Sequence, residues 1–442
     1  MNEVIHKCLN LFKAKGIEGE VFLINSRRTK ITVSSGKVDT LEEREERGCG
    51  IRVFHKKRIG FSYTSDLSEG SLHATIQNAY DFSLLSSEDD SNILPPPMAV
   101  DPLESFNASI LEILASRKIA FAARIEESAR KLDPRIEKVR EATYKDFIGD
   151  IYLANTAGVD LFYRAGRAAG YIELSATDGR SSQAGSHHAF GLTMDDIDPE
   201  EIGRIAARKA LDKLGARDFK TAKTKVVLSN EMAANLLAET ALIFSAKKVL
   251  KNKSLLIGKL GKKIASTTLT LIDDGRKSEG FFAAPFDGEG VPTRETFIIR
   301  EGHLENYLHN YQTALKMNLD HTSNCVRNSS LSSPKIGISN LYVKPSSHPP
   351  EEIIGSVNSG IYITDLLGLH TADTITGDFS LGAAGRVIEN GRLSYPVQKI
   401  AISGNLLTLL ESVEAVGNDL KFSLWSGGGV TLLLKEMSVS GT

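Results

Sequence analysis

The second half of the chain contains mostly short β-type runs, and this feature constrains the fold more than any other. From about Thr224 the sequence is rich in Gly, Thr and Ser, and few segments have a helical pattern. The candidate strands are residues 268–272, 295–299, 337–343, 360–364 and 430–434, and one late helix is predicted over 404–414. Such a pattern favours a large antiparallel, barrel-like sheet domain over residues 224–442.

The first half has a different pattern and predicts two further units. Residues 1–93 read as an N-terminal helix–sheet–helix unit, with strands at 21–24, 29–33, 51–54 and 59–63 and a second helix over 67–82. A polar stretch at 86–92 and the prolines at 95–97 indicate a linker. Residues 94–223 read as a central α/β unit, with a helix ending at Pro134, strands at 139–143, 150–154, 159–163 and 169–175, and a helix over 200–214. The predicted fold class is therefore α+β.

Composition excludes several classes of protein. The chain has 442 residues, a net charge of -2 and 24% charged residues, which gives no electrostatic footprint for nucleic acid. It has no run of about 18 apolar residues for a membrane span. The three cysteines, Cys8, Cys49 and Cys325, share no CxxC spacing, and the N-terminus has no apolar signal region. We therefore expect a cytoplasmic protein.

One local stretch departs from the balanced charge. Its members are all lysines within 17 residues: Lys247, Lys248, Lys251, Lys253, Lys259, Lys262 and Lys263. Two interpretations are open, a solvated face and a contact with an acidic partner or peptide.

The junction at residues 225–235 is the most informative local motif. A short β-type run, 225–228, is followed by Ser229, a good N-cap, and by an Ala/Leu-rich helix. A metallopeptidase helix at such a junction would carry His-Glu-x-x-x-His. Here Asn230 and Asn235 hold the two ligand positions and only Glu231 remains. Because a carboxamide is a poor zinc ligand, we expect no metal in this chain and treat Glu231 as a vestigial helix-start residue.

Other candidate sites have weaker signals. Residues 377–385, including Gly377, Asp378, Phe379, Ser380 and Gly382, are glycine-rich and form no phosphate loop. They predict either a turn or bulge between strands or a place where a ligand backbone approaches closely. An oxygen and nitrogen metal set from His370, Asp373 and Asp378 is disfavoured, because such groupings are common by chance.

The remaining nucleophile and histidine candidates are interpreted as structural. Arg327 could lower the pKa of Cys325, but a buried structural cysteine is favoured. His187 and His188 would point in opposite directions on a strand and are expected at the surface. His303 and His309 are assigned to barrel or edge positions.

Several blocks, taken together in order and spacing, resemble the TldD/PmbA family, once described as modulators of DNA gyrase. They are FDGEGVPTR (286–294), YLHN (307–310), GDFS (377–380), IENG (388–391), PV (396–397), SGNL (403–406) and AVGNDL (415–420), with VSSGK (33–37) near the N-terminus. The resemblance spans nearly the whole chain.

The resemblance implies a particular kind of subunit. The TldD kind carries His-Glu-x-x-x-His, at a spacing that implies a π-type widening of the helix, and a late cysteine as third ligand. In this chain residues 424–427 occupy that late region, and the last cysteine is Cys325. The chain thus resembles the PmbA/TldE kind, which lacks the ligands.

That kind implies a set of expectations. They are a non-catalytic subunit of a metalloprotease acting on unfolded or extended peptides, zinc held by a TldD-like partner, and homodimers when the chain is alone. An extended peptide would add to a sheet edge near residues 377–385. Two alternatives remain: a stand-alone binding or regulatory protein without proteolysis, and an independent hydrolase that uses other residues.

Overall fold

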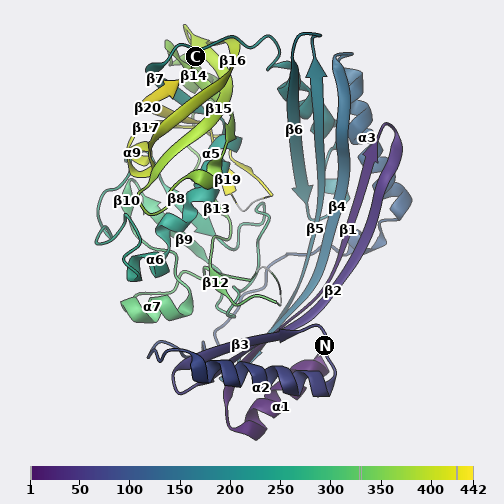
Figure 1. The fold of residues 1–442 in the computed structure, drawn as a ribbon, viewed down its shortest axis with the longest axis vertical. Helices are drawn as coiled ribbons and strands as arrows, with labels where there is room; N and C mark the ends of the chain where they lie inside the picture. Colours follow the sequence, from purple (N-terminus) through teal and green to yellow (C-terminus); the bar gives the residue numbers. More distant parts are fainter. Residues whose placement is uncertain (1, 328, 330, 425–426, 442) are drawn as a thin grey trace.

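A long six-stranded antiparallel sheet and a barrel-containing C-terminal domain lie side by side in the computed structural model (Figure 1). The structure describes residues 2–327, 329, 331–424 and 427–441. In spatial order the sheet contains β3 (Arg58–Thr64), β2 (Lys37–His55), β1 (Glu18–Ser34), β4 (Ile136–Asn155), β5 (Asp160–Thr177) and β6 (Ser182–Gly191). The mixed α and β class predicted from the sequence is confirmed.

The strands of this sheet are longer than the sequence pattern predicted. The four runs expected at 139–143, 150–154, 159–163 and 169–175 are two continuous strands, β4 of 20 residues and β5 of 18. At about 3.3 Å per residue, β4 extends about 65 Å. The residues that looked like a break, 144–149, stay paired with 165–170 of β5, because buried Tyr144 and Asp146 alternate with exposed Lys145.

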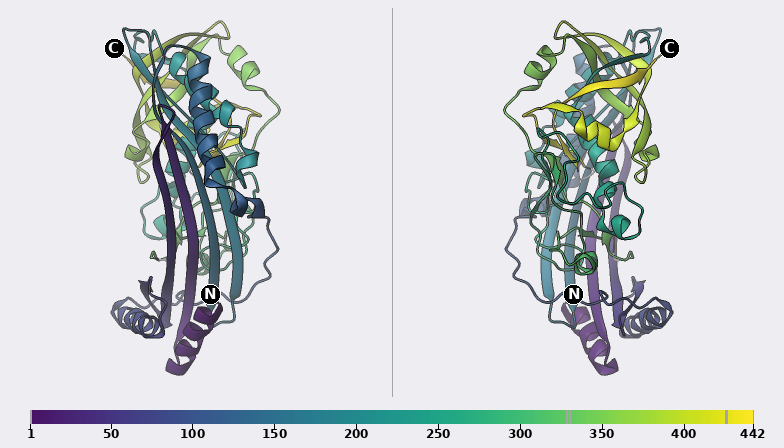
Figure 2. Two further views of the ribbon diagram at one scale, coloured as in Figure 1. Left: turned by 90° about the vertical axis from the view of Figure 1, so that its right-hand side faces the viewer. Right: turned by 90° about the vertical axis from the view of Figure 1, so that its left-hand side faces the viewer.

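Helices cover one face of the sheet, and the C-terminal domain packs on the other (Figure 2). The helices are α1 (Asn2–Lys15), α2 (Glu69–Leu85), α3 (Ala115–Leu132) and α4 (Pro199–Leu211), with a 3-10 turn at Ala108–Glu112. Along β4, Tyr144 and Ile148 pack with the α3 and α4 core, whereas Ile151 and Leu153 pack with Phe286 of the C-terminal domain. Because successive side chains of β4 point to opposite faces of the sheet, this one strand contributes residues to two cores.

The sheet runs across the predicted domain boundary at 93/94. That boundary lies between α2 and the 3-10 turn, in a segment without regular structure. The antiparallel pairing of β1 with β4, from Glu20↔Asn155 to Val33↔Ala142, joins strands from both sides of it. None of the helices in the described ranges is both long and apolar enough to cross a membrane.

The C-terminal domain contains a closed five-stranded barrel, as its sequence pattern predicted. The barrel strands are β7 (Ala222–Leu228), β14 (Ser359–Leu367), β15 (Asp378–Glu389), β16 (Arg392–Asn405) and β20 (Leu432–Ser440), and β17 (Val413–Val416) adds to β20. Pairing of β16 with β20 closes the barrel. One pair, β7 with β14, is parallel, so the sheet is not antiparallel throughout.

A second sheet and, among the described residues, five α-helices belong to the same domain. The sheet contains β8 (Leu271–Asp274), β9 (Glu295–Arg300), β10 (His303–Leu304), β13 (Leu341–Val343), β18 (Lys421–Phe422) and β19 (Gly427–Gly429), and β11 (Cys325–Val326) pairs with β12 (Lys335–Ile336). The helices are α5 (Asn230–Thr240), α6 (Ala246–Leu250), α7 (Tyr311–Met317), α8 (Pro350–Gly355) and α9 (Leu406–Glu411), the last of which confirms the predicted late helix.

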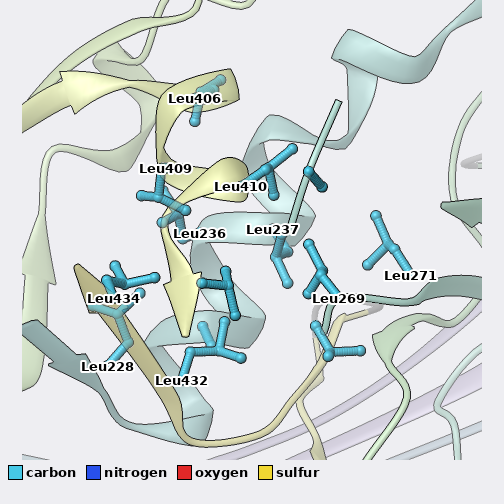
Figure 3. Packing of buried hydrophobic residues seen from close by; sticks show 14 of the residues in the cluster. Leu228, Leu236, Leu237, Leu269, Leu271, Leu406, Leu409, Leu410, Leu432 and Leu434 are labelled. Carbon is cyan, nitrogen blue, oxygen red and sulfur yellow. The ribbon is translucent and has the colours of Figure 1, made fainter. Parts of the chain in front are cut away.

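Helix α5 packs into the core of this domain. Leu236 and Leu237 lie among the leucines of β7, β20 and α9, which include Leu228, Leu406, Leu409, Leu410, Leu432 and Leu434 (Figure 3). Each of these side chains is at most 7% exposed. Burial of one such leucine contributes about 1.5–3 kcal/mol, so the position of α5 is set by its apolar face.

A buried cluster of four charges joins the long sheet to the C-terminal domain. Arg52 of β2 donates to Glu20 of β1 at 2.9 Å and to Glu289 at 2.9 Å, and Arg327 pairs with Glu20. All four side chains are at most 6% exposed. Burial would raise the pKa of Glu20, but Arg52 and Arg327 together hold it below the usual value. The two positive and two negative charges balance, although Arg327 Nη1 has no hydrogen-bond partner among the described residues.

Replacing Arg52 by Met should lower the free energy of unfolding by about 3–5 kcal/mol, because it leaves Glu289 buried without its ion-pair partner. Urea denaturation followed by circular dichroism measures the change. The matched control is Arg44→Met on the same strand, since Arg44 is 76% exposed and its pair with Glu42 is a surface pair. That variant should lie within about 0.5 kcal/mol of the parent. Equal losses of the free energy of unfolding for the two variants would contradict the interpretation that this cluster joins the long sheet to the C-terminal domain.

Candidate functional site

The junction between β7 and α5 forms as its sequence predicted. Ser229 caps the helix, its hydroxyl accepting from the Met232 N–H at 3.3 Å. The Asn230 amide is held at both ends: its Nδ2 donates to the Asp419 carbonyl at 3.0 Å, and its Oδ1 accepts from the Glu231 N–H at 2.7 Å. Asn230 therefore ties the start of α5 to the C-terminal segment.

The two asparagines do not converge on a common point. Helix α5 is an α-helix from Asn230 to Thr240, without the π-type widening that a metal-binding spacing of five implies. At 3.6 residues per turn, positions five apart are about 140° apart around the axis. Asn235 is half-buried, and its side chain makes no hydrogen bond within the described residues.

The strand β19 packs directly on α5 through glycine backbone. A Cβ on Gly429 would lie 2.1 Å from the Asn230 carbonyl oxygen, and one on Gly427 would lie 2.8 Å from that of Ala234. Only glycine permits this approach, so these two β19 positions supply no side chain toward the helix. Of the predicted late region 424–427, residues 425 and 426 lie outside the described residues.

Glu231 is part of an ion pair rather than an open carboxylate. Lys209 of α4 donates to Glu231, and both side chains are about one-third exposed. The pair bridges the long-sheet half and the C-terminal domain. The contact with Lys209 occupies the carboxylate, so Glu231 is not an open group facing a substrate or a metal.

Two histidines of β6 contact the same region, and the assignment of His187 to the surface was wrong, whereas His188 is half-buried. His187 is only 6% exposed and accepts from Lys421 of β18 at 3.2 Å, while His188 Nε2 accepts from the Leu424 N–H at 3.4 Å. Their rings lie 6.0 Å apart with planes at 25°, instead of pointing apart. The reason is that β6 is an edge strand, so the C-terminal segment at 421–424 packs along it and receives both rings.

Burial sets the protonation of these histidines. Burial, then the positive charges of Lys421 and Lys209, lowers the pKa of His187 to about 2. The pKa of His188 is also lowered by burial, and the nearby Glu231 only partly opposes this. Burial and the charge of Lys209 also lower the pKa of Lys421. Neutral rings beside two ammonium groups are hydrogen-bond acceptors.

The glycine-rich segment is a strand with a bulge, as one of its two interpretations predicted. Gly377 has a φ of 84° and turns the chain into β15, and the register shifts between Ala383 and Gly385. Phe379 is buried in the barrel core at 5% exposed, whereas Asp378 and Ser380 are exposed. From Gly382 onward β15 is paired on both sides, so any free edge is confined to residues 378–381.

The oxygen and nitrogen set around residue 370 does not converge. Asp373 Oδ1 accepts from the backbone N–H groups of Ile375 and Thr376, and Asp378 accepts from Asn405 at 2.9 Å. The Asp373 carboxylate is occupied by contacts within its own turn, and that of Asp378 by the cross-strand partner Asn405. Throughout the described ranges, His, Cys, Asp and Glu side chains form no group of three or more that would hold a metal.

Cys325 is buried, in keeping with its interpretation as structural. Burial, then Glu289 and Asp287, raises the pKa of its thiol well above the usual range, although Arg52 and Arg327 oppose this. Arg327 therefore does not activate it. His303 lies on the edge strand β10, whereas His309 lies outside the strands and is only 1% exposed.

Two residues that lie near Glu231 in the structure were not predicted from the sequence, because they are distant from it along the chain. Lys209 and Lys421 lie 22 positions before and 190 positions after it, and neither stands in a recognisable motif. Sequence reasoning also missed Asp287, whose pKa is raised to about 7 by burial and by the neighbouring Glu289. The block FDGEGVPTR that contains Asp287 was the available signal.

Comparison with known proteins identifies relatives along most of the chain. Models of PmbA/TldA metallopeptidase domain 1, central domain and C-terminal domain match residues 19–82, 109–214 and 221–441. Metalloprotease PmbA of Escherichia coli O157:H7 is 29% identical over 450 residues, which cover 100% of this chain and 96% of that protein. A metalloprotease of Methanocaldococcus jannaschii is 28% identical, with 89% and 88% covered.

Solved structures share the same architecture. A Thermotoga maritima protein, described as a modulator of a DNA gyrase, superposes with a TM-score of 0.92 at 28% identity, covering 99% of this chain and 100% of that one. TldE from Thermococcus kodakarensis superposes with a TM-score of 0.90 at 22% identity, and 100% of each chain is covered. The second likeness is one of fold.

Gly429→Ala should destabilise the chain by about 1–3 kcal/mol, because the added methyl overlaps the Asn230 carbonyl and forces β19 away from α5. Thermal denaturation measures the change. Gly70→Ala in α2 is the matched control, since its new methyl meets nothing within 4 Å and should leave stability equal or slightly higher. A Gly429→Ala protein as stable as the parent would show that β19 does not rest on the helix.

His187 should make the protein less stable in mild acid. The unfolded chain protonates this ring near pH 6.5, whereas the folded chain resists protonation until about pH 2. Below pH 6.5 the unfolded state therefore binds more protons, and the free energy of unfolding falls by up to about 1.4 kcal/mol per pH unit. Compared with His187→Gln, the parent should lose this additional amount between pH 6 and pH 5.

Urea denaturation at each pH gives the comparison for His187, and groups that both proteins share cancel in the difference. His303→Gln, at an exposed histidine, is the control and should follow the parent. Parallel curves for the parent and His187→Gln would mean that the ring is protonated in the folded state.

Proposed function

This chain belongs to the PmbA/TldA metallopeptidase family, and from that premise we propose that it is a non-catalytic, PmbA/TldE-type subunit of a two-subunit metalloprotease. The partner is a TldD-like subunit that holds zinc, and the substrate is an unfolded or extended peptide. This chain stabilises the partner and shapes the chamber that receives the peptide.

The observation that carries the proposal is the state of the helix where a metal would be held. Asn230 and Asn235 replace imidazoles, lie on different sides of a regular α-helix, and the first has both ends of its amide bonded within the chain. The donor set does not fit zinc, which takes thiolate, imidazole or carboxylate ligands in a tetrahedral arrangement. The three cysteines are buried elsewhere.

The environment of Glu231 supports the same assignment. In a metallopeptidase helix this Glu would be free to accept a proton. Here it is paired with Lys209 and joins α5 to α4. Glu231 therefore has a structural role, in place of the proton transfer that a metallopeptidase helix would require of it.

The peptide would bind along the start of β15. Residues 378–381 pair with β16 on one side, while β14 ends at Leu367, opposite Gly382. An added strand would bond to this short stretch of main chain, so sequence preference would be weak. Phe379 would contribute only its backbone, because its ring is in the core.

We further propose that the protein works in the cytoplasm, as a heterodimer with the TldD-like subunit and as a homodimer when alone. Three buried cysteines without a disulfide between them suit a reducing compartment.

The test is a peptidase assay with three samples: this chain, the TldD-like subunit of the same organism, and the mixture. An unfolded casein fragment should be cleaved at a substantial rate only by the mixture, and a chelator should stop the cleavage. Metal analysis of this chain alone should find far less than one zinc per chain. Chelator-resistant cleavage by this chain alone would favour an independent hydrolase. A mixture no better than the partner alone would favour a stand-alone binding protein.

Supplying the two imidazoles should not restore activity. The double variant Asn230→His, Asn235→His places both rings about 140° apart on α5 and removes the bond from Asn230 to Asp419. A catalytic zinc needs three ligands, and β19 offers only glycine. We expect weak zinc binding by calorimetry and no turnover by the variant alone. Robust, chelator-sensitive turnover would show that a third ligand is already in place.

A further inference from the structure

A small pocket lies where three parts of the chain meet: the long sheet, the linker after α2 and the C-terminal domain. Its volume is about 120 Å³, and the lining includes Arg52 and Glu289 of the buried charge cluster. An engineered cavity of about 150 Å³ binds benzene, so this pocket has room for a ligand of about six to eight non-hydrogen atoms. A nucleotide or a large cofactor needs several times this volume.

The long sheet supplies an apolar wall to this pocket. Arg52 of β2 stands opposite Phe61 of β3, and Phe54 stands opposite Ile59. Because side chains alternate along a strand, these four residues share one face of the sheet, and all four line the pocket. Ile93 of the linker, which is 44% exposed, adds a further apolar side chain. The pocket therefore favours a ligand with an apolar body.

The charged groups that line the pocket give it a net positive charge. Arg52 and Glu289 belong to the buried cluster whose charges balance. Lys247 of α6 and Lys335 of β12 also line the pocket, and among the described residues neither ammonium group has an ion-pair or hydrogen-bond partner. The Asn310 side-chain nitrogen likewise has no partner there, whereas its oxygen caps α7. Two ammonium groups and one amide N–H are therefore free to bind an anionic acceptor.

Contacts behind the pocket hold its walls in place. The Lys57 carbonyl at the end of β2 accepts from the Asp89 N–H at 2.9 Å and from the Asn92 side chain at 2.8 Å, which ties the linker to the sheet. Gln312 of α7 donates to Asn92, and Lys316 of α7 pairs with Asp89. The pocket is therefore formed without a ligand, so binding does not have to order these segments.

We propose that this pocket binds a small carboxylate with an apolar body. The carboxylate would accept from Lys247, Lys335 and the Asn310 amide, and the apolar body would contact Phe61 and Ile93. Among the described residues, none of α5 or β15 lines the pocket, so this site is separate from the elements that carry the proposed function. Two sources have this chemistry: a short branched fatty acid and the C-terminal residue of an apolar peptide.

Isothermal titration calorimetry of the full-length chain with isocaproate tests the proposal. This ligand has about eight non-hydrogen atoms, so we expect a dissociation constant of about 1 mM or lower, which ligands of this size can reach. Isocaproamide has the same shape without the charge. It should bind at least about tenfold more weakly, because hydrogen bonds to a charged acceptor are about twice as strong as neutral ones.

Two variants examine the two parts of the site. Lys335→Glu should weaken isocaproate binding by about tenfold, because it places a negative charge beside the carboxylate. Ile93→Ser should weaken it by about threefold, because it removes apolar contact area. The matched control is Lys344→Glu, an exposed lysine of the same domain that does not line the pocket, and it should bind like the parent. Melting curves establish that each variant is folded.

N-acetyl-leucine distinguishes the two sources of the ligand. It presents the C-terminal residue of a peptide, whereas isocaproate carries the same branched side chain without the backbone amide. Tighter binding of N-acetyl-leucine would assign the site to a peptide end, and tighter binding of isocaproate would assign it to a free short-chain acid. Both rankings support a carboxylate site.

Three results would overturn the proposal. One is the absence of binding heat for both carboxylates up to about 10 mM, together with an unchanged midpoint of thermal denaturation. Another is binding of isocaproamide as tight as that of isocaproate, since charge would then play no part. The third is unchanged binding by both Lys335→Glu and Ile93→Ser, which would place the ligand elsewhere on the chain. Each of these results leaves the proposed function standing, because the peptidase assay does not use this pocket.

Discussion

The relative placement of the long sheet and the C-terminal domain depends on one buried contact. In it, Arg52 and Arg327 pair with Glu20 and Glu289. Two of these charges belong to the long sheet and two to loops of the C-terminal domain. A buried charge is tolerated only when it is paired, so neither half is complete without the other. At a second point of contact, His187 meets Lys421 and Lys209 meets Glu231. The polar contacts around α5 are therefore a consequence of how the halves are joined.

Helix α5 has a structural role that does not depend on a metal. The buried face of α5, with Met232, Leu236 and Leu237, is part of the core next to the barrel. The backbone of α5 packs directly against the glycines of β19. Asn230 and Asn235 are half-buried and are not part of this apolar cluster, so the core does not depend on metal-ligating side chains at these positions. Removing the helix would open the core.

Sequence reasoning succeeded where the signal is local. The cap at Ser229, the late helix and the barrel-like C-terminal domain all follow from capping chemistry, spacing and composition within a few residues. The long strands were divided in prediction because Lys145, Asp146 and Gly149 resemble a loop. Pairing with β5 keeps them extended, and that pairing is a non-local fact.

The candidate site was predicted only in part, because several of its contacts join residues that are distant in the sequence. Asn230, Glu231 and Asn235 stand in one motif, whereas Lys209, Lys421 and His187 reach the same place from three other elements. His187 is buried because residues 421–424 pack along the edge of β6. The residues around position 187 do not indicate this contact.

The contacts that Glu231 and Asn230 make indicate which role each residue has. Glu231 alone would be ambiguous, because the same side chain serves as a general base or as a helix-start residue. Its pairing with Lys209, and the bonding of Asn230 to Asp419 and to the Glu231 N–H, assign both residues to structural roles. A metal-binding or proton-transfer role for these residues would require those contacts to break. Lys209 and Lys421 would oppose a bound cation near Glu231 through their own charge, and this supports the proposal that the metal is held by another subunit.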